Sequence, residues 1–227
     1  MLIQVYKTKW YTSFDIVRKA KKIFEWQKVG HAGTLDPWAE WVLVLWTWKD
    51  TKALWQIQKQ DKEYITEVDF STSTDTWDMQ YHSWYKQFEV ENSDWKKYLI
   101  VNWSRILAPN LEEVKEKLDL LIPKYGLPLP PFSAKKTGWK KFYELARKGE
   151  IIEKTQQMTT YQVEVLSYSF PFLKIRLIVG SWNYIRSIWY WLGKQFELSG
   201  TLSYLQRTRV GNYNINDCKE IDYLTKL

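Results

Sequence analysis

The chain has 227 residues and carries 33 Lys and Arg against 26 Asp and Glu, a net charge of +7 that favours an anionic partner such as nucleic acid. Its single cysteine, Cys218, excludes an internal disulfide framework and a cysteine-based zinc site, and favours a reducing compartment. There is no signal-peptide pattern and no apolar run of the roughly 20 residues that cross a bilayer, so we expect a cytoplasmic protein without a membrane span.

Two elements are predicted in the first third of the chain. Residues 12–24 predict a helix that begins at Thr12 or Ser13. Its apolar stripe consists of Phe14, Val17, Ile23 and Phe24. Residues 63–70 alternate between two faces and predict a half-buried strand. One face of this strand carries Tyr64, Thr66, Val68 and Phe70.

The remaining elements lie beyond residue 110. Residues 110–122 predict a helix with Asn110 as its N-cap and Glu113 at the capping-box position. Its apolar face consists of Leu111, Val114, Leu118 and Leu121. The prolines of residues 127–134 predict an extended linker, and a short basic helix over 140–149 ends at Gly149. Strands are expected at 161–168 and 173–180, followed by a helix at 185–196.

Strands and helices interleave in this order without a regular β-α-β rhythm. The pattern favours an α+β fold with a mixed sheet, and no repeat, low-complexity tract or domain boundary interrupts residues 1–227. We therefore expect one domain.

Metal and cofactor chemistry finds little support in the sequence. The two histidines, His31 and His82, lack metal-ligand spacing, and no glycine-rich phosphate loop or GxSxG motif is present. We expect no metal and no cofactor.

Asp36 is the residue most suggestive of chemistry, although an aspartate before a proline is also a common turn-former. It lies in "KVGHAGTLDPWAEWVLVLWTWKDTK", which resembles the "GTLDP" signature of the bacterial TruB family of tRNA pseudouridine synthases. Four further stretches resemble segments of that family in the same order along the chain. They are "KWYTSFDIVRKA", "KEYITEVDFSTSTDTWD", "PPFSAKKTGWKKFYELARKG" and "SWNYIRSIWYWLGK" with "YLQRTRVGNYNI".

The resemblance implies a pseudouridine synthase-like fold, with a mostly antiparallel central sheet flanked by helices and a basic active-site cleft. It also implies isomerisation of the T-loop uridine of tRNA, conventional position 55. Asp36 would be the nucleophile or base and Arg186 its ion-pair partner. Tyr64 would stack on the flipped base and Leu205 would close the apolar side of the pocket. Without the family, Arg186 is an ordinary surface arginine, and Tyr64 and Leu205 are ordinary core residues.

RNA contacts are expected from basic residues around the site. His31 would meet the flipped-out region of the RNA, although it could instead cap its own turn, and Lys28 and Lys52 flank the Asp36 motif. Residues 130–152 correspond to the family's thumb, which clamps the RNA loop, and there Lys136 and Arg147 are candidate phosphate ligands. The expected partner is the tRNA T-arm stem-loop, bound by a monomer that lacks the C-terminal RNA-binding module of many family members.

Tryptophan and glycine depart from ordinary usage, with 15 Trp against 9 Gly. Tryptophan replaces family glycines at Trp10, Trp41, Trp48, Trp139 and Trp182, with Trp46, Trp77 and Trp189 as further candidates. Since no steric logic favours this exchange, our hypothesis is that UGA codons meant as glycine were translated as tryptophan. If the tryptophans are real, poor folding is expected.

Two other functions remain open at this point. The protein could be a tRNA-folding chaperone without turnover, or a related synthase that acts on ribosomal RNA within a guide complex. The presence of Asp36, Tyr64 and Arg186 argues against the first, and the short chain argues against the second.

Overall fold

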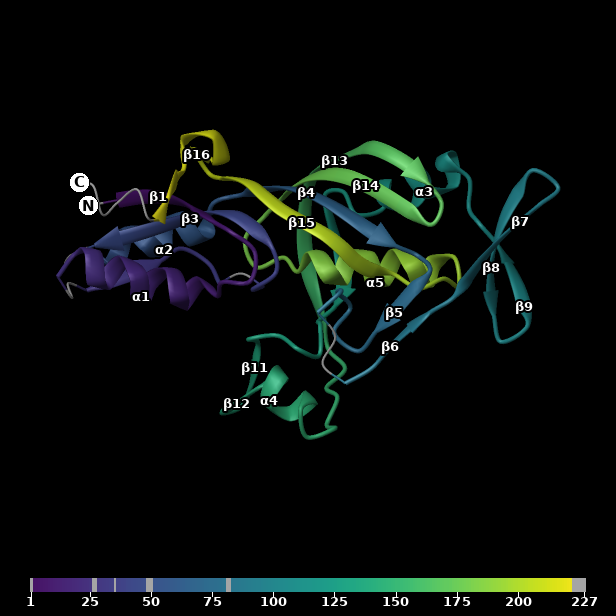
Figure 1. Ribbon diagram of the computed structural model, residues 1–227, viewed down its shortest axis with the longest axis horizontal. Helices are drawn as coiled ribbons and strands as arrows, with labels where there is room; N and C mark the ends of the chain where they lie inside the picture. The colour runs from purple at the N-terminus through teal and green to yellow at the C-terminus, as the bar shows by residue number, and fades with distance from the viewer. Residues whose placement is uncertain (1, 26–27, 35, 48–50, 81–82, 222–227) are drawn as a thin grey trace. The chain divides into compact units, whose positions relative to one another are not determined.

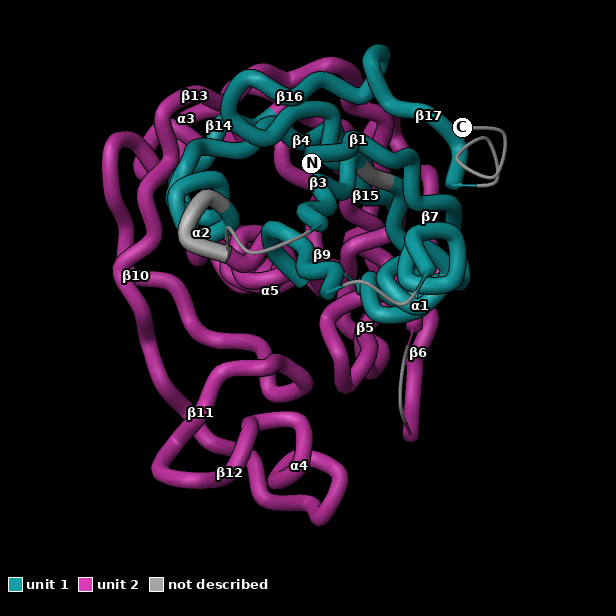
Figure 2. Tube along the Cα trace, turned by 90° about the vertical axis from the view of Figure 1, so that its left-hand side faces the viewer, with its two compact units in different colours: residues 1–65, 177–181, 204–227 teal, residues 66–176, 182–203 magenta. Residues whose placement is uncertain are grey.

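The computed structural model describes residues 2–25, 28–34, 36–47, 51–80 and 83–221 (Figure 1). These form two compact units, coloured separately in Figure 2. Unit 1 comprises residues 1–65, 177–181 and 204–227, and unit 2 comprises residues 66–176 and 182–203. Strands β4 (Lys62–Asp69), β14 (Phe172–Val179) and β15 (Thr201–Val210) have residues in both units. A single catalytic domain over 1–227 stays a prediction.

Unit 1 is a sheet with two helices. Apart from the shared strands, its elements are β1 (Leu2–Lys7), α1 (Ser13–Ile23), β2 (Val29–His31), β3 (Glu40–Thr47), α2 (Thr51–Lys59), β16 (Tyr213–Asn214), the 3₁₀ turn Ile215–Asp217 and β17 (Lys219–Glu220). Strand β3 pairs antiparallel with β1 and β2 and parallel with β15, and β1 pairs parallel with β17. Both helices contact β2.

The core of unit 1 determines where the loop carrying Asp36 begins and ends. Ala32, at the start of that loop, is fully buried with Val42 and Val44 of β3. Leu54 and Ile57 of α2 complete the same cluster with Val210. The loop therefore starts in this cluster at Ala32 and ends where β3 begins at Glu40.

Unit 2 contains a sheet, a three-stranded meander and three helices. Its own elements are β5 (Thr72–Thr74), β6 (Tyr85–Gln87), β7 (Glu89–Ser93), β8 (Lys96–Val101), β9 (Ser104–Leu107), α3 (Leu111–Asp119), β10 (Lys124–Pro128), β11 (Lys136–Thr137), β12 (Lys140–Lys141), α4 (Phe142–Ala146), β13 (Thr155–Ser169) and α5 (Ile185–Gln195). Strand β13 lies between β10 and β14, and α5 contacts β10 and α3. Figures 1 and 2 both show β11, β12 and α4 standing apart from this sheet.

The expectation of an α+β fold with a mixed, mostly antiparallel sheet is confirmed, as are the helices at 12–24, 110–122 and 185–196. The helix expected over 140–149 is shorter, Phe142–Ala146, because Lys140 and Lys141 pair with β11 as strand β12. Thr12 and Asn110 each form a capping box, with Asp15 and Glu113 respectively. The predicted alternation in β4 holds, since Tyr64, Thr66 and Val68 are buried, as is Phe70 directly after the strand. No helix among the described residues is long and apolar enough to cross a membrane.

Two predicted helix faces were partly wrong. In α1 the buried apolar residues are Ile16, Val17 and Ala20, whereas Phe14 is 59% exposed and lies under the guanidinium of Arg18. In α3, Val114 and Leu118 are buried but Leu111 is 37% exposed. In both cases the first-turn residue lies outside the stripe that the sheet covers, because an apolar residue on a helix surface need not face the core.

The capping box of α3 gives a stability prediction. The Asn110 side chain accepts from the Glu113 backbone N–H at 3.0 Å, and the Glu113 carboxylate accepts from the Asn110 backbone N–H at 2.7 Å. Asn110→Ala removes the first bond and should lower the free energy of unfolding by about 1 kcal/mol. Urea denaturation measures this, and Asn110→Ser, which keeps a capping oxygen, should retain most of the stability. Equal losses in both variants would contradict the capping role.

Candidate active site

Asp36 lies half-buried in the loop between β2 and β3. Its backbone carbonyl accepts from the Ala39 N–H at 3.3 Å, which closes a turn around Pro37. The Pro37 carbonyl in turn accepts from the Trp10 backbone N–H at 2.8 Å. The segment that carries the carboxylate is therefore fixed to the connection between β1 and α1.

Lys7, the last residue of β1, hydrogen-bonds to the same loop. Its side chain is fully buried, and its Nζ donates to the carbonyls of Thr8, Tyr11 and Pro37 at 3.1, 2.7 and 2.8 Å. Burial lowers the pKa of Lys7 from 10.5 to about 8, and the negative charge of Asp36 opposes this shift. At neutral pH a buried ammonium therefore acts electrostatically on Asp36.

Tyr64 and Arg207 are two further buried polar residues of unit 1 that interact with this loop: the charge of Asp36 acts on Tyr64, and Arg207 approaches Gly33. Both are buried, and the Arg207 side chain hydrogen-bonds to that of Tyr64. Burial raises the pKa of Tyr64, and the adjacent guanidinium lowers it. Arg207 also donates from Nε and Nη2 to the Val42 carbonyl of β3 at 3.2 and 2.7 Å. Leu205, on the same strand as Arg207, is 4% exposed.

The sequence patterns did not indicate Arg207 or Lys7, because a single buried cation leaves no periodic signal in the sequence. Gly33 shows how closely Arg207 approaches the Asp36 loop: a Cβ at this glycine would lie 3.4 Å from the Arg207 Nη1 atom. Its φ of 93° is also one that favours glycine.

His31 begins the same loop and is half-buried. Its Nδ1 lies 3.2 Å from the Gly33 carbonyl, so the imidazole caps its own turn. Burial lowers the pKa of His31, the hydrogen bond to Gly33 raises it, and the positive charge of Arg207 lowers it. The net direction is downward, which leaves the ring neutral at pH 7.

In unit 2 the residue of interest is Arg186, at the start of α5 and 6% exposed. Its Nη1 lies 3.1 Å from the Asp78 carboxylate and donates to the Thr76 carbonyl at 2.9 Å. Its Nη2 donates to the Phe132 carbonyl at 3.1 Å. The surface-arginine alternative is thus wrong, while its pairing with Asp36, a residue of unit 1, stays a prediction.

Asp78 is a third residue that the sequence patterns did not indicate, although it closes the "TDTWD" stretch. Its Oδ1 accepts from the Thr76 hydroxyl at 2.9 Å and from the Gln80 backbone N–H at 2.8 Å, while Oδ2 faces Arg186. The carboxylate thereby orients the guanidinium relative to α5 and the Phe132 carbonyl.

The lysine and arginine residues predicted to bind phosphates are exposed where their side chains are described. Lys28, Lys136 and Arg147 all have exposed side chains, and the Arg147 guanidinium lies 5.4 Å from the Tyr143 ring centre. The side chain of Lys52 lies outside the described residues. Exposed cations on β11 and after α4 are accessible to phosphates, as the predicted role requires. Among the described residues, no cluster of His, Cys, Asp or Glu could hold a metal ion.

Comparison with known proteins decides the family. Residues 21–185 match the TruB family pseudouridylate synthase (N terminal domain). The chain belongs to the TruB family. A relative from Protochlamydia amoebophila, named tRNA pseudouridine synthase B, is 36% identical over 230 residues, 100% of this chain and 81% of the relative. A relative of the same name from Phocaeicola vulgatus is 33% identical, over 94% of this chain and 86% of its own length.

Solved structures agree with this family at the level of the fold. An H/ACA RNP bound to a substrate RNA containing 2'-deoxyuridine matches with a TM-score of 0.67 and 19% identity, over 99% of this chain and 52% of the other. A Cbf5-Nop10-Gar1 complex matches with a TM-score of 0.65 and 20% identity, over 94% of this chain. The TruB-family chain thus spans about half the length of these structural neighbours. As a member of the TruB family it is an enzyme that isomerises uridine to pseudouridine.

The depressed pKa of His31 in this TruB-family chain predicts a titration below the ordinary value. In the folded protein the imidazole should lose its proton below pH 6.5, and in urea it should return to about 6.5. Because the folded state binds this proton less tightly, protonation of His31 should favour unfolding as the pH falls below about 6.5. NMR of the imidazole protons measures both values, and a folded pKa above that in urea would contradict the burial of the ring.

Lys7 gives a second pH prediction, of the same sign. Its pKa is about 8 in the folded state against 10.5, so the unfolded chain holds more protons between these values and Lys7 makes stability rise with pH there. Lys7→Met removes this contribution. The urea midpoint of the unsubstituted chain, measured relative to that of Lys7→Met, should therefore rise between pH 8 and pH 10. Parallel curves for the two proteins would contradict it.

Proposed function

We propose that this enzyme acts on the T-loop uridine of tRNA, conventional position 55, and that Asp36 is the group that carries the reaction. The first support is the name of its relatives, tRNA pseudouridine synthase B. The second support carries the assignment to Asp36. This residue lies on a loop that Lys7 holds by a hydrogen bond to Pro37, and its charge acts on Lys7 and Tyr64.

The proposed chemistry needs only a carboxylate in a site that excludes water. The uridine N1–C1′ bond breaks, the base turns, and a C5–C1′ bond forms, after which the C5 proton is lost and N1 gains one. Atoms and electrons balance without a redox cofactor or a metal. Asp36 serves either as the nucleophile at C1′ or as the base that removes a sugar proton.

The neighbouring residues divide the remaining tasks. Tyr64 stacks on the extruded base, since aromatic faces commonly hold flipped bases, and Leu205 forms the apolar wall. Arg186 pairs with Asp36 and keeps it ionised, because an adjacent cation favours the charged form of a carboxyl group. Its bond to Asp78 would then orient the guanidinium.

The RNA contacts follow from the exposed basic residues. In this proposal residues 130–152 clamp the T-arm, with Lys136 and Arg147 on its phosphates, while Lys28 and Lys52 bind phosphates beside the Asp36 loop. His31 is neutral at pH 7, and because its Nδ1–H faces the Gly33 carbonyl, its Nε2 accepts a hydrogen bond from the flipped-out region of the loop instead of neutralising a phosphate. A monomer is sufficient for this arrangement.

Release of tritium from tRNA labelled at C5 of uridine tests the assignment of Asp36. Asp36→Asn should lower the rate by at least about 10³-fold, since a side chain that carries the chemistry has no substitute in the site. Asp119→Asn, which changes an exposed carboxylate at the end of α3, should release tritium at the unsubstituted rate. Circular dichroism of both variants separates loss of chemistry from loss of fold.

The alternatives are outcomes of the same experiment. Equal release from the unsubstituted chain and Asp36→Asn would refute the role of Asp36. A folded, RNA-binding protein that releases no tritium in either form would favour the chaperone. Mapping the pseudouridine to a ribosomal RNA site, with T-loop uridine unchanged, would favour the related rRNA synthase.

A further inference from the structure

Two tight hairpins in unit 2 carry tryptophan at a position that normally requires glycine. Strands β7 and β8 pair up to Ser93 and Lys96, and β8 and β9 pair up to Val101 and Ser104. Each loop therefore has two residues, Asp94–Trp95 in the first hairpin and Asn102–Trp103 in the second. Two-residue hairpins of this kind are typically type I′ turns, in which both central residues have positive φ.

The backbone angles identify both loops as turns of this type. The φ values are 52° and 62° at Asp94 and Trp95, and 48° and 69° at Asn102 and Trp103. Asp and Asn tolerate the left-handed region at the first position, and glycine is strongly preferred at the second. Asp-Gly and Asn-Gly are the commonest signals for this turn, and here tryptophan takes the place of the glycine in both.

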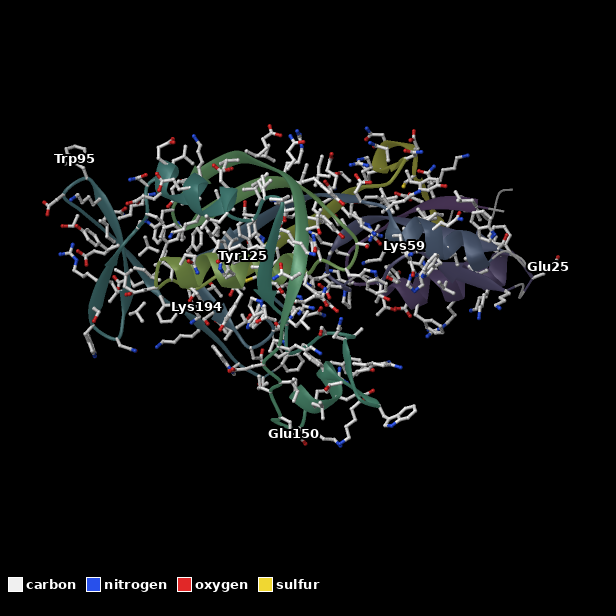
Figure 3. The ribbon with its side chains drawn as sticks, turned by 180° about the vertical axis from the view of Figure 1, so that it is seen from behind. Glu25, Lys59, Trp95, Tyr125, Glu150 and Lys194 are labelled. Carbon is white, nitrogen blue, oxygen red and sulfur yellow. The ribbon has the colours of Figure 1, made fainter. Side chains whose placement is uncertain are left out.

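The indole side chains gain nothing that would offset this strain. Trp95 is 107% exposed and Trp103 is 99% exposed, so neither buries apolar surface. Figure 3 shows Trp95 at the tip of its hairpin, pointing away from the strands. A large aromatic residue with no packing partner in a strained turn has no structural reason to be there.

The same backbone conformation recurs at three tryptophans elsewhere. The φ angles are 71° at Trp10, 63° at Trp77 and 68° at Trp182. Among the described residues, nine non-glycine residues have positive φ, and five of these are tryptophans. Asn and Asp are the residues usually enriched in this region, and a bulky residue there is an outlier. One residue type therefore accounts for most of the strain.

These three tryptophans adjoin the segments of the candidate site. The Trp10 N–H donates to the Pro37 carbonyl of the Asp36 loop. Trp77 lies between Thr76 and Asp78, the partners of Arg186. Trp182 lies in the turn before α5, which carries Arg186.

We propose that Trp10, Trp77, Trp95, Trp103 and Trp182 occupy positions that the source organism fills with glycine, because it reads their UGA codons as glycine. Trp10 and Trp182 also coincide with family glycines, and Trp77 is a further candidate from the family pattern. Trp95 and Trp103 lie outside every family motif in the sequence, so the turn geometry supports the proposal independently of the resemblance and of the proposed function. The reassignment accounts for the excess of Trp and the deficit of Gly together.

The other tryptophans that the family pattern singles out show no positive φ where they are described. Trp139 follows Gly138, whose φ is 58°, and has no positive φ itself. Trp46 lies in β3 and packs against the unit 1 core, and Trp189 is fully buried with its Nε1 donating to the Thr66 hydroxyl at 2.8 Å. Trp41 has the extended backbone of β3, and Trp48 lies outside the described residues. For these five, replacement of glycine stays a prediction from the family pattern.

The gene and the native protein provide the decisive test. The codons at positions 95 and 103 should be UGA in the source genome, and UGG at either would refute the proposal there. Tryptic peptides 87–96 and 98–105 of protein isolated from the source organism each contain one of the two positions. Mass spectrometry should find glycine in both peptides, and tryptophan in either peptide would overturn the proposal.

A recombinant series tests the physical argument. Combined Trp95→Gly and Trp103→Gly should raise Tm by about 2–4 °C per position or more, because glycine removes the left-handed penalty. The matched pair Trp95→Ala and Trp103→Ala removes the indoles but keeps a Cβ, so it should gain much less. Trp55→Gly, in the interior of α2 with Lys59 over its ring, should lower Tm. Equal gains from alanine and glycine would refute the backbone argument, and so would no gain from glycine. If the unsubstituted chain does not fold, the peptide masses decide.

Discussion

The arrangement of unit 1 depends on a guanidinium buried in its sheet. Arg207, on β15, donates twice to a carbonyl of β3 and hydrogen-bonds to Tyr64 of β4, and so links three strands that are far apart in the sequence. A buried charge is costly unless its hydrogen bonds are satisfied, so these strands can only adopt positions that satisfy it. The Asp36 loop then lies against this cation at Gly33 and against Lys7 at Pro37.

Unit 2 repeats this principle with a different set of partners. Arg186 connects the start of α5 to Asp78 and Thr76, and to the Phe132 carbonyl. Breaking a buried, hydrogen-bonded ion pair by removing one partner typically costs about 3–5 kcal/mol. The residue expected to serve the chemistry therefore also holds its own unit together, and loss of activity in an Arg186 variant must be interpreted together with its stability.

The tryptophans are where local preference and global fold disagree. Natural sequences are locally consistent with their folds, and the departures that persist usually have a functional reason. The Asp94–Trp95 and Asn102–Trp103 turns have no such reason, since both indoles are exposed. The tryptophans in these turns also explain why the sequence pattern predicts no strands over residues 71–109. With glycine at positions 95 and 103, the dipeptides Asp-Gly and Asn-Gly would mark both hairpins of the β7–β9 meander.

The sequence by itself determined the features that depend on neighbours along the chain. The capping boxes at Thr12 and Asn110, the alternation in β4 and the TruB motif around Asp36 are all encoded within a few residues. Tertiary structure decided which apolar residue of α1 faces the sheet, leaving Phe14 exposed, and which groups surround each buried cation. Arg207 meets Tyr64 and Val42, and Arg186 meets Asp78, because burial forces distant polar groups to satisfy one another, and such pairings leave no periodic trace in the sequence.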